Sequence, residues 1–133
     1  MSEILVDKLT GKTTADSVTV TDGATTFNML TALNKMWISF DGINLVTFAS
    51  FNVSSVTDNG SGDYTYNFSN NFNATEEYSC AMSACLQSSA YMGSYTEHNT
   101  HLTSSITVNP ARNSSGTNLD LNNTTMNCCG ELA

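Results

Sequence analysis

Basic residues are scarce in this 133-residue chain, which has four Lys and Arg against twelve Asp and Glu and a net charge of −8. The four cations are spread along the sequence, as Lys8, Lys12, Lys35 and Arg112. Because nucleic acids and anionic membranes are bound through concentrated positive surfaces, we expect neither as a partner. No apolar run reaches the ~20 residues of a membrane helix, and residues 1–7 lack the features of a secretory signal. We therefore expect a protein made in a cytoplasm, without membrane insertion.

Charged residues make up only 12% of the chain, and proline occurs once. The polar half consists mainly of 19 Thr, 17 Ser and 16 Asn residues. Their side chains compete with the helical backbone for hydrogen bonds but are common in strands and turns. The composition therefore predicts an all-β fold, and the length suits a single domain.

Cysteine occurs four times, at positions 80, 85, 128 and 129. Neighbouring residues of a strand face opposite ways, as do residues separated by an odd number of positions such as 80 and 85. In the absence of a secretory signal, we expect four reduced and mostly buried thiols. The spacing also differs from that of zinc ligands, so we expect neither a metal nor another cofactor.

Alternating apolar and polar residues predict eight or so short antiparallel strands arranged as a sandwich or barrel. The clearest unit is a hairpin, in which segments 51–57 and 64–69 flank the turn-forming segment 58–63. The alternation is interrupted at Ala49 and Ser50, which predicts a bulge or a crossing between sheets. Further strands are expected at 17–21, 38–41, 45–48, 78–86, 102–108 and 126–129.

One helix is expected, at residues 26–37, because apolar residues there recur every three or four positions. These residues include Phe27, Leu30, Leu33 and Trp37. A helix of about three turns is marginal alone and has to pack on the sheets. We interpret residues 1–25 as an N-terminal β arm or first strands, and residues 26–133 as the β-sandwich domain.

Catalytic motifs are lacking: the sequence has no nucleophile elbow, phosphate-binding loop or dinucleotide fingerprint. His98 and His101 would face opposite sides of a strand, which does not favour a shared metal. Asp58 and Asp63 flank the hairpin turn, where acidic side chains usually accept local hydrogen bonds. We therefore expect a protein that is not an enzyme, with a pair of carboxylates for glycan cleavage as a less favoured alternative.

The segment 87–100 is predicted to be a long loop, and such loops are often functional. In and beside it, Tyr91, Tyr95, Asn99 and His101 would offer planar rings next to hydrogen-bonding groups. Such side chains suit the recognition of a glycan or a protein surface. The alternative, equally favoured, is that they close over the core or over a subunit interface.

Four segments of the chain resemble small tail-fibre-like structural proteins of marine bacteriophages. The most specific is residues 51–68, FNVSSVTDNGSGDYTYNF. The others are LVDKLTGKT at 5–13 followed by SVTV at 17–20, LNKMWISFDG at 33–42, and GELA at 130–133. None of them falls within residues 80–109, and the sequence departs from the resemblance in the Cys-, Met- and Tyr-rich stretch 80–95.

This resemblance implies a β-rich and usually trimeric virion protein, made in the host bacterial cytoplasm, whose partners are its own copies and other virion proteins. The implied role is host attachment by a tail fibre or appendage, through a host surface glycan or protein. Two alternatives remain at this point: a capsid decoration or tail component without a receptor role, and a glycan-binding or glycan-cleaving module.

Overall fold

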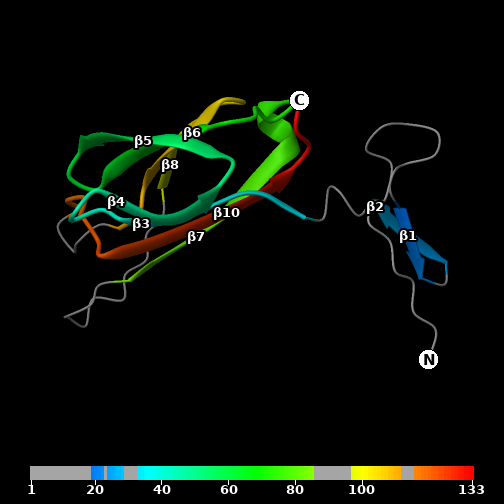
Figure 1. Cartoon of the computed structure of the whole chain (residues 1–133), viewed down its shortest axis with the longest axis horizontal. Helices are drawn as coiled ribbons and strands as arrows, with labels where there is room; N and C mark the ends of the chain where they lie inside the picture. Colours follow the sequence, from blue (N-terminus) through cyan, green and yellow to red (C-terminus); the bar gives the residue numbers. More distant parts are fainter. Residues whose placement is uncertain (1–18, 23, 29–32, 86–96, 112–115) are drawn as a thin grey trace. The chain divides into compact units, whose positions relative to one another are not determined.

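The computed structural model describes residues 19–22, 24–28, 33–85, 97–111 and 116–133, in which the regular elements are ten strands and one short 3₁₀ helix (Figure 1). The elements are β1 (Thr19–Asp22), β2 (Thr25–Asn28), β3 (Asn34–Asp41), β4 (Val46–Phe51), β5 (Val53–Gly60), β6 (Asp63–Phe68), η1 (Thr75–Glu77), β7 (Tyr78–Cys85), β8 (Glu97–His101), β9 (Ser105–Asn109) and β10 (Asn123–Gly130).

The chain divides into two compact units, Met1–Leu33 and Asn34–Ala133. In the smaller unit, β1 and β2 pair antiparallel, with Asp22 opposite Thr25 at the turn and Thr19 opposite Asn28 at the open end. β1 corresponds to the strand predicted at 17–21, where apolar and polar residues alternate.

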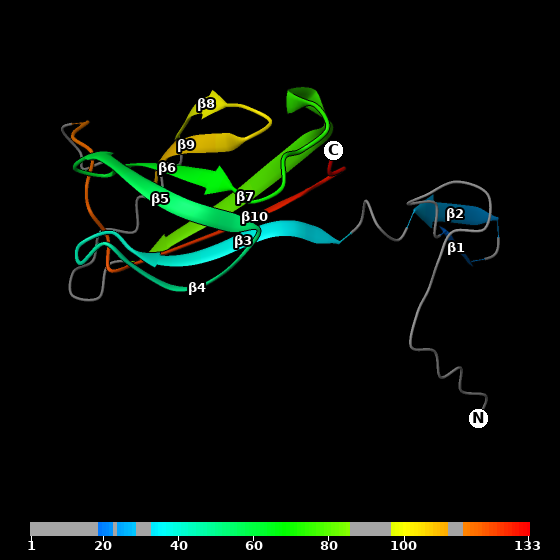
Figure 2. The same cartoon turned by 45° about the horizontal axis from the view of Figure 1, so that its top comes forward.

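The larger unit is an antiparallel β-sandwich. One sheet has the strand order β4-β3-β10-β7, and the other has the order β5-β6-β9-β8. The two sheets bury one shared hydrophobic core, to which both central strand pairs contribute. Figure 2 shows the two layers, with β3, β4 and β10 below and β5, β6, β8 and β9 above. The predicted all-β fold is therefore confirmed as an antiparallel sandwich.

Large aromatic side chains fill the middle of the sandwich. Phe40 on β3 lies with its ring edge-on to Tyr64 and Tyr66 on β6, at centroid distances of 5.1 and 6.2 Å. All three rings are buried. Edge-on aromatic pairs are favourable beyond the apolar area that they bury, so Phe40 joins the two sheets at their centres.

The predicted helix at 26–37 is wrong, because residues 26–28 belong to strand β2 and residues 34–37 to strand β3. On β3 the side chains of Met36, Ile38 and Phe40 are buried, while those of Lys35 and Trp37 are not. This period of two fits a strand whose hydrogen bonds on both sides are taken by β10 and β4. The apolar spacing also fitted a short helix, but such a helix has little stability of its own, and sheet pairing outweighs it.

The predicted hairpin is confirmed. β5 and β6 pair antiparallel and extend into the turn, which leaves only Ser61 and Gly62 between them. Gly62 has a left-handed φ of 58°, and a Cβ added there would lie 2.5 Å from the backbone nitrogen of Leu119. The tightness of this turn therefore depends on glycine.

The interruption predicted near Ala49 is also present, as two separate features. The β3–β4 register shifts between Ser39 and Phe40, and the chain then passes from one sheet to the other between β4 and β5. At that crossing Asn52 is buried with a φ of 58°. Its side-chain oxygen accepts a hydrogen bond from the Asn70 backbone at 2.7 Å, which holds the crossing in place.

Two other strand boundaries differ from those predicted. Residues 97–101 form strand β8, where a loop was expected, and residues 102–104 form the turn before β9. β10 covers eight residues instead of the four expected and lies between β3 and β7. Long-range pairing extends these strands beyond the segments in which the sequence alternates clearly.

We expect Phe40→Ala to destabilise the protein by about 3–5 kcal/mol, because it removes the ring that joins the two sheets and leaves a cavity. Urea unfolding followed by circular dichroism measures the loss. Leu102→Ala is the control: its side chain is 48% exposed on the turn between β8 and β9, so its effect should stay within about 0.5 kcal/mol. Equal losses in the two variants would contradict this packing.

Candidate functional site

Large apolar side chains lie exposed on the hairpin formed by β3 and β4. Their exposed fractions range from 39% for Trp37 to 59% for Phe48. This group, the apolar hairpin face, consists of Trp37, Ile43, Leu45, Val46, Phe48 and Phe51. In the rest of the described chain, only Leu33 and Leu102 are large, apolar and similarly exposed. Single exposed apolar residues are ordinary, but a concentration of them marks a contact surface.

The sheet register places two of the aromatic residues together. Trp37 on β3 is directly opposite Phe51 on β4. Because directly opposite residues share a face of the sheet, both rings lie on the side opposite the buried Met36 and Ile38. The outer face of this sheet therefore carries a cross-strand aromatic pair.

β4 is the edge strand of its sheet, and all six of its residues are exposed. Figure 2 shows β4 along the lower border of the sandwich. An edge strand pairs on one side only and therefore offers N–H and C=O groups to a further strand. The apolar hairpin face thus combines apolar side chains with a backbone edge that is able to form hydrogen bonds.

The turn between β3 and β4 is fixed by Asp41. One carboxylate oxygen accepts hydrogen bonds from the backbone nitrogens of Ile43 and Asn44 at 2.9 and 3.0 Å, and the other accepts one from the Asn44 side chain at 2.8 Å. The Asn44 side chain and the two backbone donors hold the pKa of Asp41 below its usual value. The turn continues to Leu45, which has a left-handed φ of 55°. Asp41 thereby holds the turn in which Ile43 and Leu45 are exposed.

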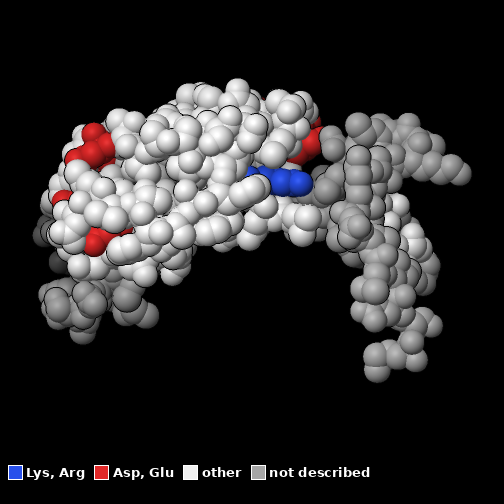
Figure 3. Space-filling view, in the orientation of Figure 1, with Lys and Arg blue, Asp and Glu red and all other residues white. Residues whose placement is uncertain are grey.

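The hairpin carries no charge between Asp41 and Asp58, because residues 42–57 include no Asp, Glu, Lys or Arg. This is a long neutral segment in a chain with a net charge of −8. Figure 3 shows one face of the larger unit on which charged side chains are also few, and its wide central area is free of acidic side chains. Neutral apolar surface suits contact with another apolar surface better than contact with ions.

The side chains predicted to recognise a partner are placed only in part. Tyr91 and Tyr95 lie outside the described residues. Asn99 belongs to strand β8, but its side chain also lies outside the description. His101 ends β8 and is half-buried, with its ring centroid 4.0 Å from that of Tyr78. Their shared role in recognition stays a prediction, and for His101 the structure shows packing against the core.

Tyr78 connects His101 to a second aromatic cluster. Its ring stacks on Phe72 at 4.1 Å and lies 6.0 Å from Phe68, and its hydroxyl donates to the Leu102 carbonyl at 2.7 Å. Burial raises the pKa of Tyr78 to about 12, so this hydroxyl remains a neutral donor. The cluster holds the β8–β9 turn against β7.

Asp120 is the centre of a polar network at the tip of the β5–β6 hairpin. Its carboxylate accepts hydrogen bonds from the Gly62 backbone nitrogen at 2.6 Å, from the Ser61 hydroxyl at 3.1 Å and from the Tyr64 hydroxyl. Burial alone would raise the pKa of Asp120. The hydrogen bonds from the three donors lower this pKa by more than burial raises it, so the net shift is downward. The same burial and the nearby Asp120 carboxylate raise the pKa of Tyr64. The ionised carboxylate therefore ties segment 116–122 to the hairpin.

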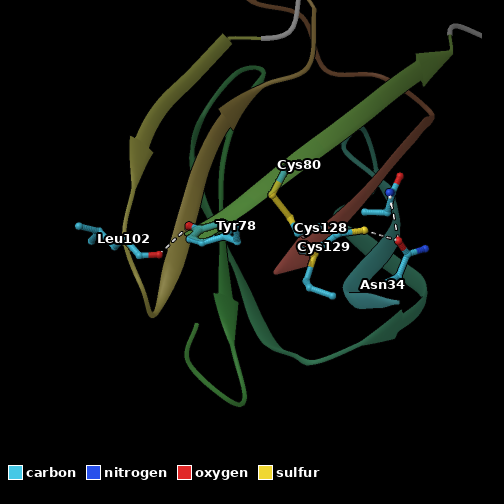
Figure 4. The surroundings of a disulfide bond; sticks show 8 residues. Asn34, Tyr78, Cys80, Leu102, Cys128 and Cys129 are labelled. Atoms are coloured by element: carbon cyan, nitrogen blue, oxygen red, sulfur yellow. Dashed lines mark hydrogen bonds between the residues drawn. A yellow bond between two sulfur atoms is a disulfide. The ribbon is translucent and has the colours of Figure 1, made fainter. Parts of the chain in front are cut away.

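Cys80 on β7 and Cys128 on β10 form a disulfide, so the prediction of four reduced thiols is wrong (Figure 4). The two residues are direct cross-strand partners with Cα atoms 4.1 Å apart. Cys129 is free, and its thiol lies 3.0 Å from the Asn34 side-chain oxygen. The pairing depends on the β7–β10 register, which joins residues 48 positions apart. The cysteine spacing contains no information on that register.

The described residues contain no group of three or more His, Cys, Asp or Glu side chains arranged to hold a metal ion. They also contain no helix long and apolar enough to cross a membrane.

Replacing Asp120 with Asn should lower the stability at pH 7 by about 1–2 kcal/mol, because charge-assisted hydrogen bonds become neutral ones. Since the folded pKa of Asp120 lies below 3.8, this contribution is present above about pH 4 and is lost as the pH falls through the folded pKa. Urea unfolding at pH 7 and pH 3 should therefore show a smaller difference between the two proteins at pH 3. Asp63→Asn, at an exposed hydrogen bond with Asn59, is the control and should change stability by less than about 0.5 kcal/mol.

Reducing the Cys80–Cys128 disulfide should destabilise the protein by about 2–4 kcal/mol, because the bond closes a long loop in the unfolded chain. The measurement is urea unfolding with and without a phosphine reductant. A variant with both Cys80→Ser and Cys128→Ser should not respond to the reductant. Peptide mapping of the purified protein without reductant should recover the Cys80–Cys128 pair, and finding only alkylated thiols would contradict the assignment.

No protein-family model matches this chain, and neither a curated protein nor a solved structure matches it.

Proposed function

We propose that this chain is a non-enzymatic structural protein of a bacteriophage virion, of the tail-fibre or appendage type. In this proposal the apolar hairpin face holds the module in its assembly, and Tyr91 and Tyr95 contribute to binding the host surface. The observation that carries the proposal is the apolar hairpin face, because exposed apolar surface of this kind marks contacts between macromolecules. The sequence resemblance to phage tail-fibre-like proteins is the reason for proposing a virion as the assembly.

The disulfide supports a site of action outside the cell. Disulfides form and persist in oxidising surroundings, including virion surfaces, whereas cytosolic thiols are kept reduced. A chain synthesised in a bacterial cytoplasm would acquire the Cys80–Cys128 bond after release from the cell. The bond then ties β7 to β10, which favours a particle component that has to survive outside its host.

The uncharged polar surface agrees with this role. On the outer face of the second sheet, Asn67 donates to Ser55 and Thr57 at 3.1 Å each, and the hydroxyls of Thr65 and Thr107 are 2.8 Å apart. Such rows of amides and hydroxyls resemble the hydrogen-bonding groups of a glycan surface. Binding through such groups depends little on salt concentration, because the groups carry no net charge.

Host attachment is tested by competition for adsorption. Host cells incubated with the purified protein should adsorb the encoding phage more slowly, because their receptors are occupied. A double variant with Tyr91→Ala and Tyr95→Ala should lose this inhibition, whereas Thr125→Ala, at an exposed position on β10, should keep it. Unchanged adsorption with the native protein would exclude a receptor role.

The place in the particle is tested on intact virions with gold-labelled antibodies against the chain. Labelling at the tail or at an appendage is expected. Labelling over the capsid surface would replace this proposal with a decoration role, and virions without any label would overturn the assignment to the particle.

A further inference from the structure

We propose that the side-chain amide of Asn59 is a site of spontaneous modification, at which the backbone nitrogen of Gly60 attacks the amide and Asp58 takes up the proton. The product has aspartate or isoaspartate at position 59. This inference goes beyond the proposed function, because it depends only on the tip of the β5–β6 hairpin and not on where the protein acts. It is carried by the sequence at the tip, by a bulge in β5 and by the hydrogen bonds of these residues.

Asn59 is the only one of the 16 asparagines that is followed by glycine. A side chain on the following residue would hinder the approach of its backbone nitrogen to the amide, and glycine has none. Gly60 has a φ of 126°. Among the described residues, no atom outside its chain neighbours lies within 4 Å of a Cβ built at Gly60. The attacking nitrogen is therefore in an open part of the backbone.

A bulge in β5 leaves Asn59 out of the strand pairing. The register pairs Asp58 with Tyr64 and Gly60 with Asp63, and it shifts between these two pairs. The extra residue of a bulge is unpaired, and the ladder is locally disrupted around it. Asn59 is also exposed, so water reaches the amide and the released ammonia has a path into solvent.

Asp58 is placed to act on the attacking nitrogen. Its Oδ1 accepts a hydrogen bond from the backbone nitrogen of Gly60 at 2.9 Å. A carboxylate within hydrogen-bond reach of a proton can take it up as a general base. The nitrogen and the amide carbon belong to adjacent residues, so the reaction is intramolecular and requires no encounter between molecules.

The reaction has two steps. In the first, the Gly60 nitrogen forms a bond to Cγ of Asn59 while the Asp58 carboxylate accepts the proton of this nitrogen. The bond between Cγ and Nδ2 breaks, the leaving nitrogen takes the proton from Asp58 and departs as ammonia, and a succinimide ring remains. In the second step, a water molecule adds to one of the two ring carbonyls and opens the ring. Addition at Cγ gives aspartate, and addition at the backbone carbonyl carbon gives isoaspartate.

The hydrogen bonds of the amide show what the conversion changes. Nδ2 of Asn59 donates to the Thr65 hydroxyl at 2.9 Å and to Oδ1 of Asp63 at 3.2 Å. A carboxylate oxygen replaces this nitrogen in the product, so both donated hydrogen bonds are lost and a negative charge faces the Asp63 carboxylate. Like charges at this separation repel one another. We therefore expect the converted protein to be less stable.

The test is incubation of the purified full chain at mildly alkaline pH, followed by chymotryptic digestion and mass spectrometry. The peptide of residues 52–64 contains Asn59 together with Asn52, which is buried and followed by Val53. We expect conversion of Asn59 to aspartate and isoaspartate, while Asn52 in the same peptide keeps its amide. Asn59→Gln retains an amide but would have to close a larger ring, so it should remain unconverted.

Asp58→Asn tests the part played by the carboxylate. This variant keeps an oxygen that can accept the hydrogen bond from Gly60, but it lacks the basic group that takes up the proton. Conversion of Asn59 should therefore be slower by about tenfold or more. Glu77→Gln removes the same charge at an exposed position outside the hairpin and should leave the rate unchanged. Circular dichroism checks that each variant is folded.

The converted protein has one more negative charge and is separated by anion exchange. Its midpoint of urea unfolding should lie below that of the unconverted protein. An Asn59 amide that persists through the incubation would overturn the inference, as would equal rates of conversion in the native protein and in Asp58→Asn. These measurements use neither host cells nor virions, so they leave the proposed function to be decided by adsorption and by the labelling of particles.

Discussion

Phe40 and the two tyrosines of β6 form the contact on which the sandwich depends. Neither sheet buries its inner face alone, and a four-stranded sheet with one apolar face is stable only against a second layer. The edge-on packing of Phe40 against Tyr64 and Tyr66 brings the middle strands of both sheets together. Once these strands are in contact, the alternation along β3 and β6 decides which side chains turn outward. The exposed position of Trp37 is therefore a consequence of the burial of Met36 and Ile38.

The outer faces of the two sheets differ in chemistry. On the second sheet, Asn67, Ser55 and Thr57 form a network of side-chain hydrogen bonds across β5 and β6. On the first sheet, the hairpin of β3 and β4 presents aromatic and aliphatic groups. Polar pairs also occur on the outer face of the first sheet, where Asn127 donates to Asn34 and Ser39 donates to Asn123, each at 3.4 Å. The exposed apolar residues gather at the hairpin of β3 and β4, so this hairpin differs in chemistry from the polar outer surface beside it.

The sequence predicts the features that depend on local alternation. The β5–β6 hairpin and its buried aromatic residues follow from a period of two around a segment of turn-forming residues. The helix predicted at residues 26–37 is wrong because Phe27, Leu33 and Trp37 also fit a helical spacing. Only the pairing of β3 with β10 and β4 distinguishes a strand from a helix at its residues. Sheet pairing joins segments far apart in the chain, so it cannot be predicted from a local pattern of residues.

The candidate site was missed from the sequence for a related reason. Alternation indicates that the two faces of a strand differ, but it does not show that β4 is an edge strand with both faces exposed. The uncharged segment 42–57 is no signal by itself, because residues 78–96 form a longer segment without Asp, Glu, Lys or Arg. The disulfide was equally hidden, because Cys80 and Cys128 become neighbours only through the register of β7 and β10.

The two edges of the first sheet are therefore not equivalent. At one edge, β7 is bonded covalently to β10 through Cys80 and Cys128, and Tyr78 anchors its start in the aromatic cluster. At the other edge, β4 is joined to β3 by ladder hydrogen bonds and by the turn that Asp41 holds. A strand added to this sheet meets apolar side chains and free backbone groups at β4. The disulfide fixes the far edge without covering the near one, so β4 is the edge at which this sheet presents exposed apolar side chains.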